Sequence, residues 1–370
     1  MRALITIFTY VLASVASLAV AQPAQTQAPA LQRHEFIIHD FHTESGVTLP
    51  EAHVVYATLG TLNAAGDNAI LLPSHYMATF NGYNWLIGSS SSSSQERALN
   101  PGRDFLVLTE LFGNGRSSSP SNTPEPFHGP RFPVMTIRDN VDAVHRLLIE
   151  ELKVQHLRAV IGFSMGAEQA FQWAVSYPTF MDRIVATSGT AKCYGHGYVR
   201  LEGQIAALTT DPAWHDGDYT TPPVNGLAAF GVVWAGWLYS QEWWRQELWR
   251  TNSPAGTTFE QAWQVFRKRF SADANDYILQ ARTWQRHDVG TTPGFNGDTE
   301  RALRSIKAKV LYMPSETDLY FPLTDARYEQ ALIPGVTFTP IPSLWGHTAG
   351  AASNPADLKF LNDKISQFLQ

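Results

Sequence analysis

The pentapeptide Gly162-Phe163-Ser164-Met165-Gly166 constrains this chain more than any other feature. A short apolar run that is typical of a buried strand ends at its first glycine, and a helical pattern begins directly after its serine. A serine between two glycines at such a junction permits a tight turn that exposes the hydroxyl group, and the first N–H groups of the helix then point toward that hydroxyl. Ser164 is therefore predicted to be a nucleophile. The alternative is that it is only a turn residue between a strand and a helix.

Strand-like and helix-like segments alternate along most of the chain. Two segments with partial polar–apolar alternation, residues 35–41 and 53–59, are predicted to be antiparallel strands. Further strands are predicted at residues 69–74, 104–110, 157–162, 183–189, 309–315 and 336–342, and helices at residues 136–152, 165–177, 324–332 and 355–369. Thr136 and Asp139 resemble a capping box at the start of the first of these helices. Such alternation predicts an α/β fold, with a mostly parallel central sheet flanked by helices.

Residues 191–299 interrupt this alternation, because they have helical patterns and lack strand-like runs. We interpret them as a helical cap inserted into a core formed by residues 33–190 and 300–370. Five of the eleven tryptophans lie between residues 234 and 249 of this cap: Trp234, Trp237, Trp243, Trp244 and Trp249. Most of them are expected to pack in the interior of the cap. The stretch from Gly88 to Ser94 contains six consecutive serines and is expected to form a flexible loop.

The first 21 residues have the pattern of a secretory signal peptide. Arg2 is followed by an apolar segment and by Ala-Val-Ala at positions 19–21, which matches a small-residue cleavage site. We therefore predict a secreted or periplasmic protein that starts at Gln22, with residues 22–32 as a disordered leader. The alternative, a membrane anchor, is disfavoured because polar residues interrupt an apolar run that is only marginally long enough to span a bilayer. No stable membrane insertion is expected after cleavage.

Composition argues against several function classes. The 370-residue chain carries a net charge of −6 and has no basic run, so a nucleic-acid partner is not expected. Its single cysteine, Cys193, cannot form an internal disulfide, and the surrounding sequence has no recognisable catalytic pattern. Neither a metal-binding pattern nor a dinucleotide fingerprint is present, since Gly113-Asn114-Gly115 lacks the third glycine. No cofactor and no metal are therefore expected, while a homodimer is compatible with the sequence.

A serine nucleophile needs a histidine base, a carboxylate that orients the base, and a second N–H donor for the oxyanion. The acid and then the histidine are expected after the serine in chain order. Asp318, with Glu316 as its rival, follows a predicted strand, and His347 lies in a glycine-flanked loop after the last predicted strand. The second donor is expected in the loop after the first parallel strand, from the N–H of either Tyr76 or Met77.

Several stretches resemble the homoserine O-acetyltransferase branch of the α/β-hydrolase superfamily. They are PSHYMATF, DFLVLTELFGNGRSSSPS, FPVMTIRDNVDAVHRLL, GFSMGAEQAFQWAVSYP, DPAWHDGDYTTPPVNGL, RFSADANDYI, DLYFP and GHT, and they extend from about residue 40 to residue 350. The resemblance implies an α/β-hydrolase fold with an inserted helical cap, in which Ser164 is the nucleophile, Asp318 the acid and His347 the base. It also implies that Met165 and Met77 donate the N–H groups of the oxyanion hole.

The chain departs from that branch at three places, two of which concern substrate recognition. The branch has a second glycine where this chain has Ala167, an aspartate where it has Thr348, and an arginine where it has Phe230 and Gly231. In the branch, the aspartate helps to bind the amino group of the substrate, and the arginine binds its carboxylate. Their replacement by a hydroxyl and by apolar residues implies that the substrate is not an amino acid.

The residues thus predict an exported serine hydrolase that cleaves an ester or a related small acyl compound through an acyl-enzyme on Ser164. Its substrate pocket is expected to include Tyr76, Phe230, Trp234, Trp237 and Thr348. One alternative is an O-acyltransferase that moves an acyl group to an alcohol, for which Arg200 or Arg245 could bind a carboxylate. A further alternative is a non-catalytic binding protein on a hydrolase fold.

Overall fold

A computed structural model describes residues 31–88 and 97–370 of the chain. The predicted signal peptide, nearly all of the predicted leader and the serine-rich stretch lie outside these residues. Across the two described ranges, no helix is both long enough and apolar enough to cross a membrane.

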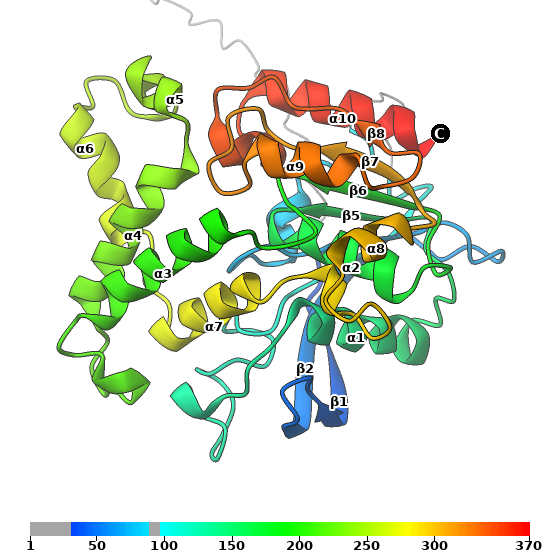
Figure 1. Cartoon of the computed structure of the whole chain (residues 1–370), viewed down its shortest axis with the longest axis horizontal. Helices are drawn as coiled ribbons and strands as arrows, with labels where there is room; N and C mark the ends of the chain where they lie inside the picture. The colour runs from blue at the N-terminus through cyan, green and yellow to red at the C-terminus, as the bar shows by residue number, and fades with distance from the viewer. Residues whose placement is uncertain (1–30, 89–96) are drawn as a thin grey trace, which may run out of the picture.

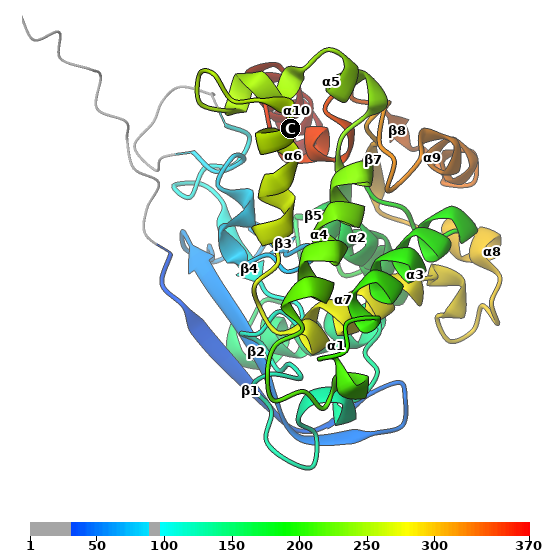
Figure 2. The same cartoon turned by 90° about the vertical axis from the view of Figure 1, so that its left-hand side faces the viewer.

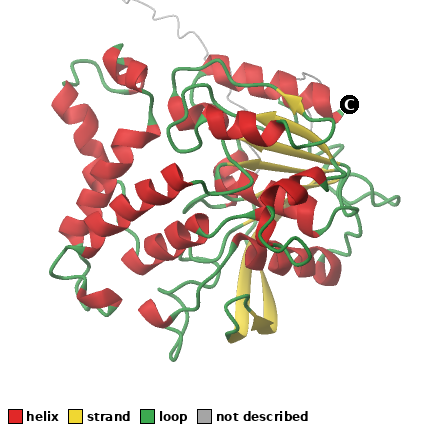
Figure 3. Cartoon of the chain, viewed as in Figure 1, coloured by secondary structure: helices red, strands yellow, loops and turns green. Residues whose placement is uncertain are grey.

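Eight strands of the described chain form one sheet in the order β1-β2-β4-β3-β5-β6-β7-β8 (Figures 1 and 3). β1 pairs with β2 and β2 with β4 in antiparallel fashion, and every other neighbouring pair is parallel. The predicted mostly parallel sheet is therefore confirmed. The strands are β1 (His34–His42), β2 (Thr48–Leu59), β3 (Ala69–Pro73), β4 (Phe105–Thr109), β5 (Ala159–Phe163), β6 (Arg183–Thr187), β7 (Lys309–Met313) and β8 (Thr337–Phe338).

Helices cover both faces of the sheet, because successive side chains of a strand point to opposite faces and both faces are apolar. Leu71 and Val160 pack with residues of α1 and α2, whereas their neighbours Ile70 and Ile161 pack with residues of α10. The core helices are α1 (Ile137–Arg146), α2 (Met165–Ser176), α8 (Thr299–Arg304), α9 (Leu323–Gln330) and α10 (Pro355–Leu369).

Three predicted elements differ from the structure by more than two residues in length. The strand predicted at residues 53–59 begins earlier, at Thr48. The capping box of Thr136 and Asp139 is present as predicted, but α1 ends at Arg146 and a single π-helical turn, Leu147–Glu151, follows it. Of the strand predicted at residues 336–342, only Thr337–Phe338 forms a strand, and Ile341 makes an isolated bridge to Ser315. Proline lacks the N–H that a strand ladder requires, and Pro340 and Pro342 both lie in this segment.

Between β6 and β7 the chain forms the helical cap, and the fully described segment 191–299 contains no strand. The cap lies to one side of the sheet in Figure 1 and in front of it in Figure 2. Residues 287–298 return along the core, where Thr292 accepts hydrogen bonds from Gln172 of α2 and Arg138 of α1. The cap helices are α3 (Gly195–Thr209), α4 (Val224–Leu238), α5 (Gln241–Arg245), α6 (Phe259–Gln264) and α7 (Ala274–Gln285).

Candidate active site

The predicted nucleophile lies on a strained turn between β5 and α2. Ser164 has φ +57° and ψ −126°, a conformation that L-residues rarely adopt and that costs about 1–3 kcal/mol. The flanking glycines make the turn possible. A Cβ atom on Gly162 would lie 1.9 Å from the carbonyl oxygen of Gly166, and a Cβ on Gly166 would lie 2.5 Å from that of Pro73. Both glycines of the GxSxG pattern are thus required, because neighbouring backbone atoms leave no room for a side chain at either position.

Ser164, His347 and Asp318 form a continuous chain of hydrogen bonds. The Ser164 Oγ is 3.0 Å from His347 Nε2, and His347 Nδ1 is 2.9 Å from Asp318 Oδ2. The second carboxylate oxygen, Asp318 Oδ1, accepts hydrogen bonds from the backbone N–H groups of Tyr320 (2.8 Å) and Phe321 (3.1 Å). All three side chains are nearly inaccessible to solvent, and Ser164 is only 2% exposed. Through these hydrogen bonds, the Ser164 hydroxyl can pass its proton to the imidazole of His347.

Each member of this chain comes from the carboxyl end of a parallel strand, which is where open α/β sheets place their binding sites. Ser164 follows β5, Asp318 lies in the loop after β7, and His347 lies in a 3₁₀ turn after β8. The rival acid Glu316 has an exposed side chain. The structure therefore brings Asp318, and not Glu316, to the histidine.

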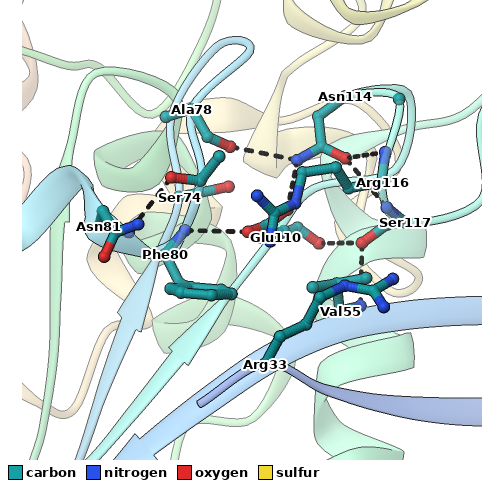
Figure 4. A network of polar contacts seen from close by, with 12 residues as sticks. Arg33, Val55, Ser74, Ala78, Phe80, Asn81, Glu110, Asn114, Arg116 and Ser117 are labelled. Carbon is teal, nitrogen blue, oxygen red and sulfur yellow. Dashed lines mark hydrogen bonds and ion pairs between the residues drawn. The ribbon is translucent and has the colours of Figure 1, made fainter. Parts of the chain in front are cut away.

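The loop after β3, residues 74–80, is called the oxyanion loop below. Buried polar groups of the β4–α1 connection hold it, as Figure 4 shows. Glu110 accepts a hydrogen bond from the Phe80 N–H (3.1 Å) and another from Asn114 Nδ2 (2.7 Å), and the same amide group donates to the Ala78 carbonyl at 3.2 Å. Burial raises the pKa of Glu110, and these donors oppose that shift. No local sequence signal points to Glu110, because the Phe80 N–H that it accepts lies 30 residues earlier in the chain.

The N–H of Met77, which the resemblance predicts to be an oxyanion donor, already has a partner. It donates to Gln280 Oε1 of cap helix α7 at 2.6 Å, and Met77 itself has a φ of +52°. On the same loop, the Tyr76 hydroxyl donates to the Tyr277 carbonyl of α7 at 2.8 Å. The Tyr76 N–H has no hydrogen-bond partner among the described residues. The Met165 N–H is the first of α2, where N–H groups have no partner within the helix.

Aromatic side chains connect the cap to the catalytic histidine candidate. The Tyr76 ring stacks on Trp234 with centroids 5.1 Å apart, Trp234 meets Tyr320 at 5.0 Å, and Tyr320 meets His347 at 4.8 Å. Phe230 is fully buried behind Trp234, at a centroid distance of 6.4 Å. Of the predicted pocket residues, Tyr76 and Trp234 thus belong to an aromatic cluster that reaches His347 through Tyr320, and Phe230 packs against Trp234.

Two other predicted pocket residues are placed differently. Trp237, three positions after Trp234 on α4, has a different ring partner and meets His196 at 5.2 Å. It lines a separate cavity of about 490 Å³ between α3 and α4. The Thr348 hydroxyl donates to the Trp345 carbonyl at 2.8 Å, so it is engaged within its own turn.

The two arginines considered as carboxylate partners have different surroundings. Arg200 is buried, and its guanidinium lies 4.2 Å from the Tyr320 ring centroid and 4.6 Å from that of Trp284. Its Nε and Nη2 have no hydrogen-bond partner among the described residues. Arg245 lies at the surface and pairs with Glu242. Of the two, only Arg200 therefore contacts the aromatic cluster, through Tyr320.

Burial shifts the pKa values of other titratable groups near the site. Burial raises the pKa of Glu168, one helical turn after Ser164, well above its usual range, and neither of its carboxyl oxygens has a partner in the described chain. Burial lowers the pKa of His75 to about 3 and raises that of Cys193 to about 12. Within residues 31–88 and 97–370, no group of three His, Cys, Asp or Glu side chains is arranged to hold a metal ion.

Comparison with known proteins gives a consistent set of relatives. A family model described as the alpha/beta hydrolase fold matches residues 81–349. The chain is 36% identical to an ethyl acetate hydrolase of Pseudomonas veronii over 332 residues, which cover 88% of this chain and 92% of the relative. It is 31% identical to a homoserine O-acetyltransferase of Nostoc punctiforme, over 92% of this chain and 96% of that protein.

Solved structures agree with this placement. The crystal structure of the acetyl esterase MekB superposes with a TM-score of 0.86 at 33% identity, and the match covers 91% of this chain and 96% of that one. The GxSxG motif, the strand order of the sheet and the strained turn at Ser164 all support an α/β-hydrolase fold. The chain therefore belongs to the α/β-hydrolase family, in the branch that includes both esterases and homoserine O-acetyltransferases.

Proposed function

We propose that this protein hydrolyses small uncharged esters through an acyl-enzyme on Ser164. The observation that carries the proposal is the hydrogen-bonded chain from Ser164 through His347 to Asp318. Relatives named as an ethyl acetate hydrolase and an acetyl esterase support ester hydrolysis as the reaction.

In the proposed reaction, His347 Nε2 takes the Ser164 proton while Oγ attacks the ester carbonyl carbon. The resulting oxyanion is held by the N–H groups of Met165 and Met77. His347 then gives the proton to the departing alcohol as the ester C–O bond breaks. Water attacks the remaining acyl-enzyme, passes one proton to His347, and releases the carboxylic acid and free Ser164. Asp318 holds the imidazole in the required tautomer throughout.

The surroundings of the site favour an uncharged substrate. Thr348 and Phe230 stand where the acetyltransferase branch binds charged groups, and neither offers a charge. The Thr348 hydroxyl is engaged by a backbone carbonyl, and Phe230 is fully buried. Moving an ammonium or carboxylate group into such a site without a partner costs several kcal/mol. Apolar esters avoid this cost.

Acyl transfer is the second candidate function. It shares the acyl-enzyme, and the 31% identity to a homoserine O-acetyltransferase supports it. The buried Arg200 beside Tyr320 is the specific feature that favours it, because its guanidinium has N–H groups without partners. In this case an alcohol, and not water, accepts the acyl group from Ser164.

Product analysis separates the two candidates. The protein is incubated with ethyl acetate alone, with ethyl acetate and homoserine, and with acetyl-CoA and homoserine. We expect acetic acid and ethanol from the ester at a rate that homoserine does not change, and no O-acetylhomoserine. Efficient formation of O-acetylhomoserine, with ester hydrolysis only a slow side reaction, would contradict the hydrolase proposal.

We also propose that the protein is exported, on the basis of the charged, apolar and small-residue segments at its N-terminus. N-terminal sequencing of the protein from a secretion-competent bacterial host tests this. The expected first residue is Gln22 in the periplasmic or extracellular fraction. An uncleaved N-terminus in the cytoplasmic or membrane fraction would refute it.

A further inference from the structure

The carboxamide of Gln280 occupies a fixed position next to the oxyanion loop. Gln280 is 1% exposed, its Oε1 accepts the Met77 N–H at 2.6 Å, and its Nε2 donates to the Phe112 carbonyl at 3.0 Å. The reversed amide orientation would place an NH₂ group against the Met77 N–H and a C=O group against the Phe112 carbonyl. Both contacts would be repulsive, so Oε1 faces Met77.

The helix that carries Gln280 cannot easily shift away from the loop. The Tyr277 carbonyl, one turn earlier on α7, accepts the Tyr76 hydroxyl. Leu279 packs so closely on Gly113 that a Cβ atom there would lie 2.8 Å from its Cδ2. The Gln280 carboxamide is therefore held against Met77 by contacts on both sides.

This arrangement creates a conflict with catalysis, because one N–H can make only one strong hydrogen bond at a time. In the resting enzyme Gln280 Oε1 is the partner of this partly buried N–H, which would otherwise lose a hydrogen bond. During reaction, the same N–H is required by the oxyanion. Building on the proposed function, we propose that Gln280 is a positioning residue, which satisfies the Met77 N–H in the resting enzyme and releases it to the oxyanion.

The exchange discriminates between the ground state and the transition state. A neutral ester carbonyl competes poorly with a neutral carboxamide, so substrate binding gains little from Met77. The charged oxyanion forms a stronger hydrogen bond and displaces Gln280 Oε1. Gln280 therefore suppresses a contact that would stabilise substrate and transition state equally, which would lower KM without raising kcat.

Replacing the carboxamide tests this exchange. Gln280→Met keeps the side-chain length but removes the acceptor, so the Met77 N–H is free for the substrate carbonyl. We expect KM for a short-chain ester to fall about two- to tenfold, because one neutral hydrogen bond contributes a free energy that corresponds to about this factor. The kcat should stay within about twofold of wild type.

The matched control is Thr283→Val on the same face of α7, which removes a buried hydrogen bond to the Met135 carbonyl without touching the oxyanion loop. It should leave KM unchanged. An unchanged or raised KM for Gln280→Met, or an equal fall for Thr283→Val, overturns the proposal.

The wild-type protein gives a test that does not depend on a variant folding. We would determine the crystal structure after reaction with a fluorophosphonate. The phosphonyl oxygen is expected to accept the Met77 N–H, with Gln280 Oε1 beyond hydrogen-bond distance. An intact Met77–Gln280 bond, with the phosphonyl oxygen bound by the Tyr76 N–H, overturns this proposal alone. Absence of an adduct on Ser164 would instead contradict the proposed function.

Discussion

The core side and the cap side of the site are built in different ways. On the core side, backbone geometry fixes the reactive groups: a strained turn presents Ser164, and two backbone N–H groups hold Asp318. On the cap side, side chains reach across the molecule, as Gln280 does to Met77 and Trp234 to Tyr76. We infer that chemistry depends on the core side and substrate selection on the cap side.

The largest effects are expected from the core side. Ser164→Ala and His347→Ala should each lower kcat by about 10⁴–10⁶, because neither half of the proton transfer works alone. The kcat of the double variant should lie no more than about tenfold below the kcat of the less active single variant. Steady-state kinetics on a neutral ester measures all three. If the two losses multiply in the double variant, Ser164 and His347 do not act as one unit.

The orienting carboxylate should rank next. Asp318→Asn should lower kcat by about 10³–10⁴, because the neutral amide favours the wrong imidazole tautomer and does not stabilise the imidazolium. The matched control is Glu316→Gln, two residues away, whose side chain is exposed and should have almost no effect. If Glu316→Gln lost more activity than Asp318→Asn, Glu316 would be the acid.

Much of the core side could be predicted from the sequence, because its signals are local. The GxSxG turn, the apolar strands and the capping box at Thr136 each lie within a few consecutive residues. The strand predicted at 336–342 was too long because two prolines interrupt it. The fold class and the grouping of Ser164, Asp318 and His347 agree with the prediction.

The contacts on the cap side could not be predicted from the sequence in the same way. Met77 and Gln280 are 203 residues apart, and nothing in either local sequence indicates that they meet. The direction of Trp237 depends on how α4 packs on α3, which the spacing of tryptophans does not determine. On the core side, the buried carboxyl group of Glu168, which has no partner among the described residues, likewise depends on tertiary packing, since the same residue on an exposed helix face is ordinary.

A change on the cap side should alter specificity more than chemistry. Trp234→Ala removes the ring that stacks on Tyr76, and the added space should shift the ratio of kcat/KM values toward longer acyl chains by about tenfold. Rates on acetyl, butyryl and hexanoyl esters of one alcohol measure this ratio. Trp237→Ala is the control, and an equal shift there would place the acyl pocket elsewhere.

An effect on stability and not on activity is expected at the contact between cap and core, where it should depend on pH. Burial raises the pKa of Asp276 on α7 to about 7, where it accepts hydrogen bonds from the N–H and hydroxyl of Ser121. Its unfolded pKa is about 3.9, so its stabilising contribution is complete below that pH and is lost as the pH rises through about 7. Relative to Asp276→Asn, the wild-type protein should lose about 1–3 kcal/mol between pH 5 and 8.

Thermal unfolding of both proteins across this range measures the loss. The asparagine can still accept from the Ser121 N–H, so the variant should fold. A difference in Tm between the two proteins that stays constant from pH 5 to pH 8 would show that Asp276 does not titrate there.

The central claim is that the core side forms an acyl-enzyme on Ser164, and rapid acid quenching tests it most directly. Wild-type protein is mixed with p-nitrophenyl acetate, quenched within milliseconds to seconds, digested and analysed by mass spectrometry. We predict an acetyl group on the peptide that contains Ser164, which decays as acetic acid appears, and none in Ser164→Ala. Ester turnover without any acetylated Ser164, or acetylation of a different residue at the rate of turnover, would contradict the account.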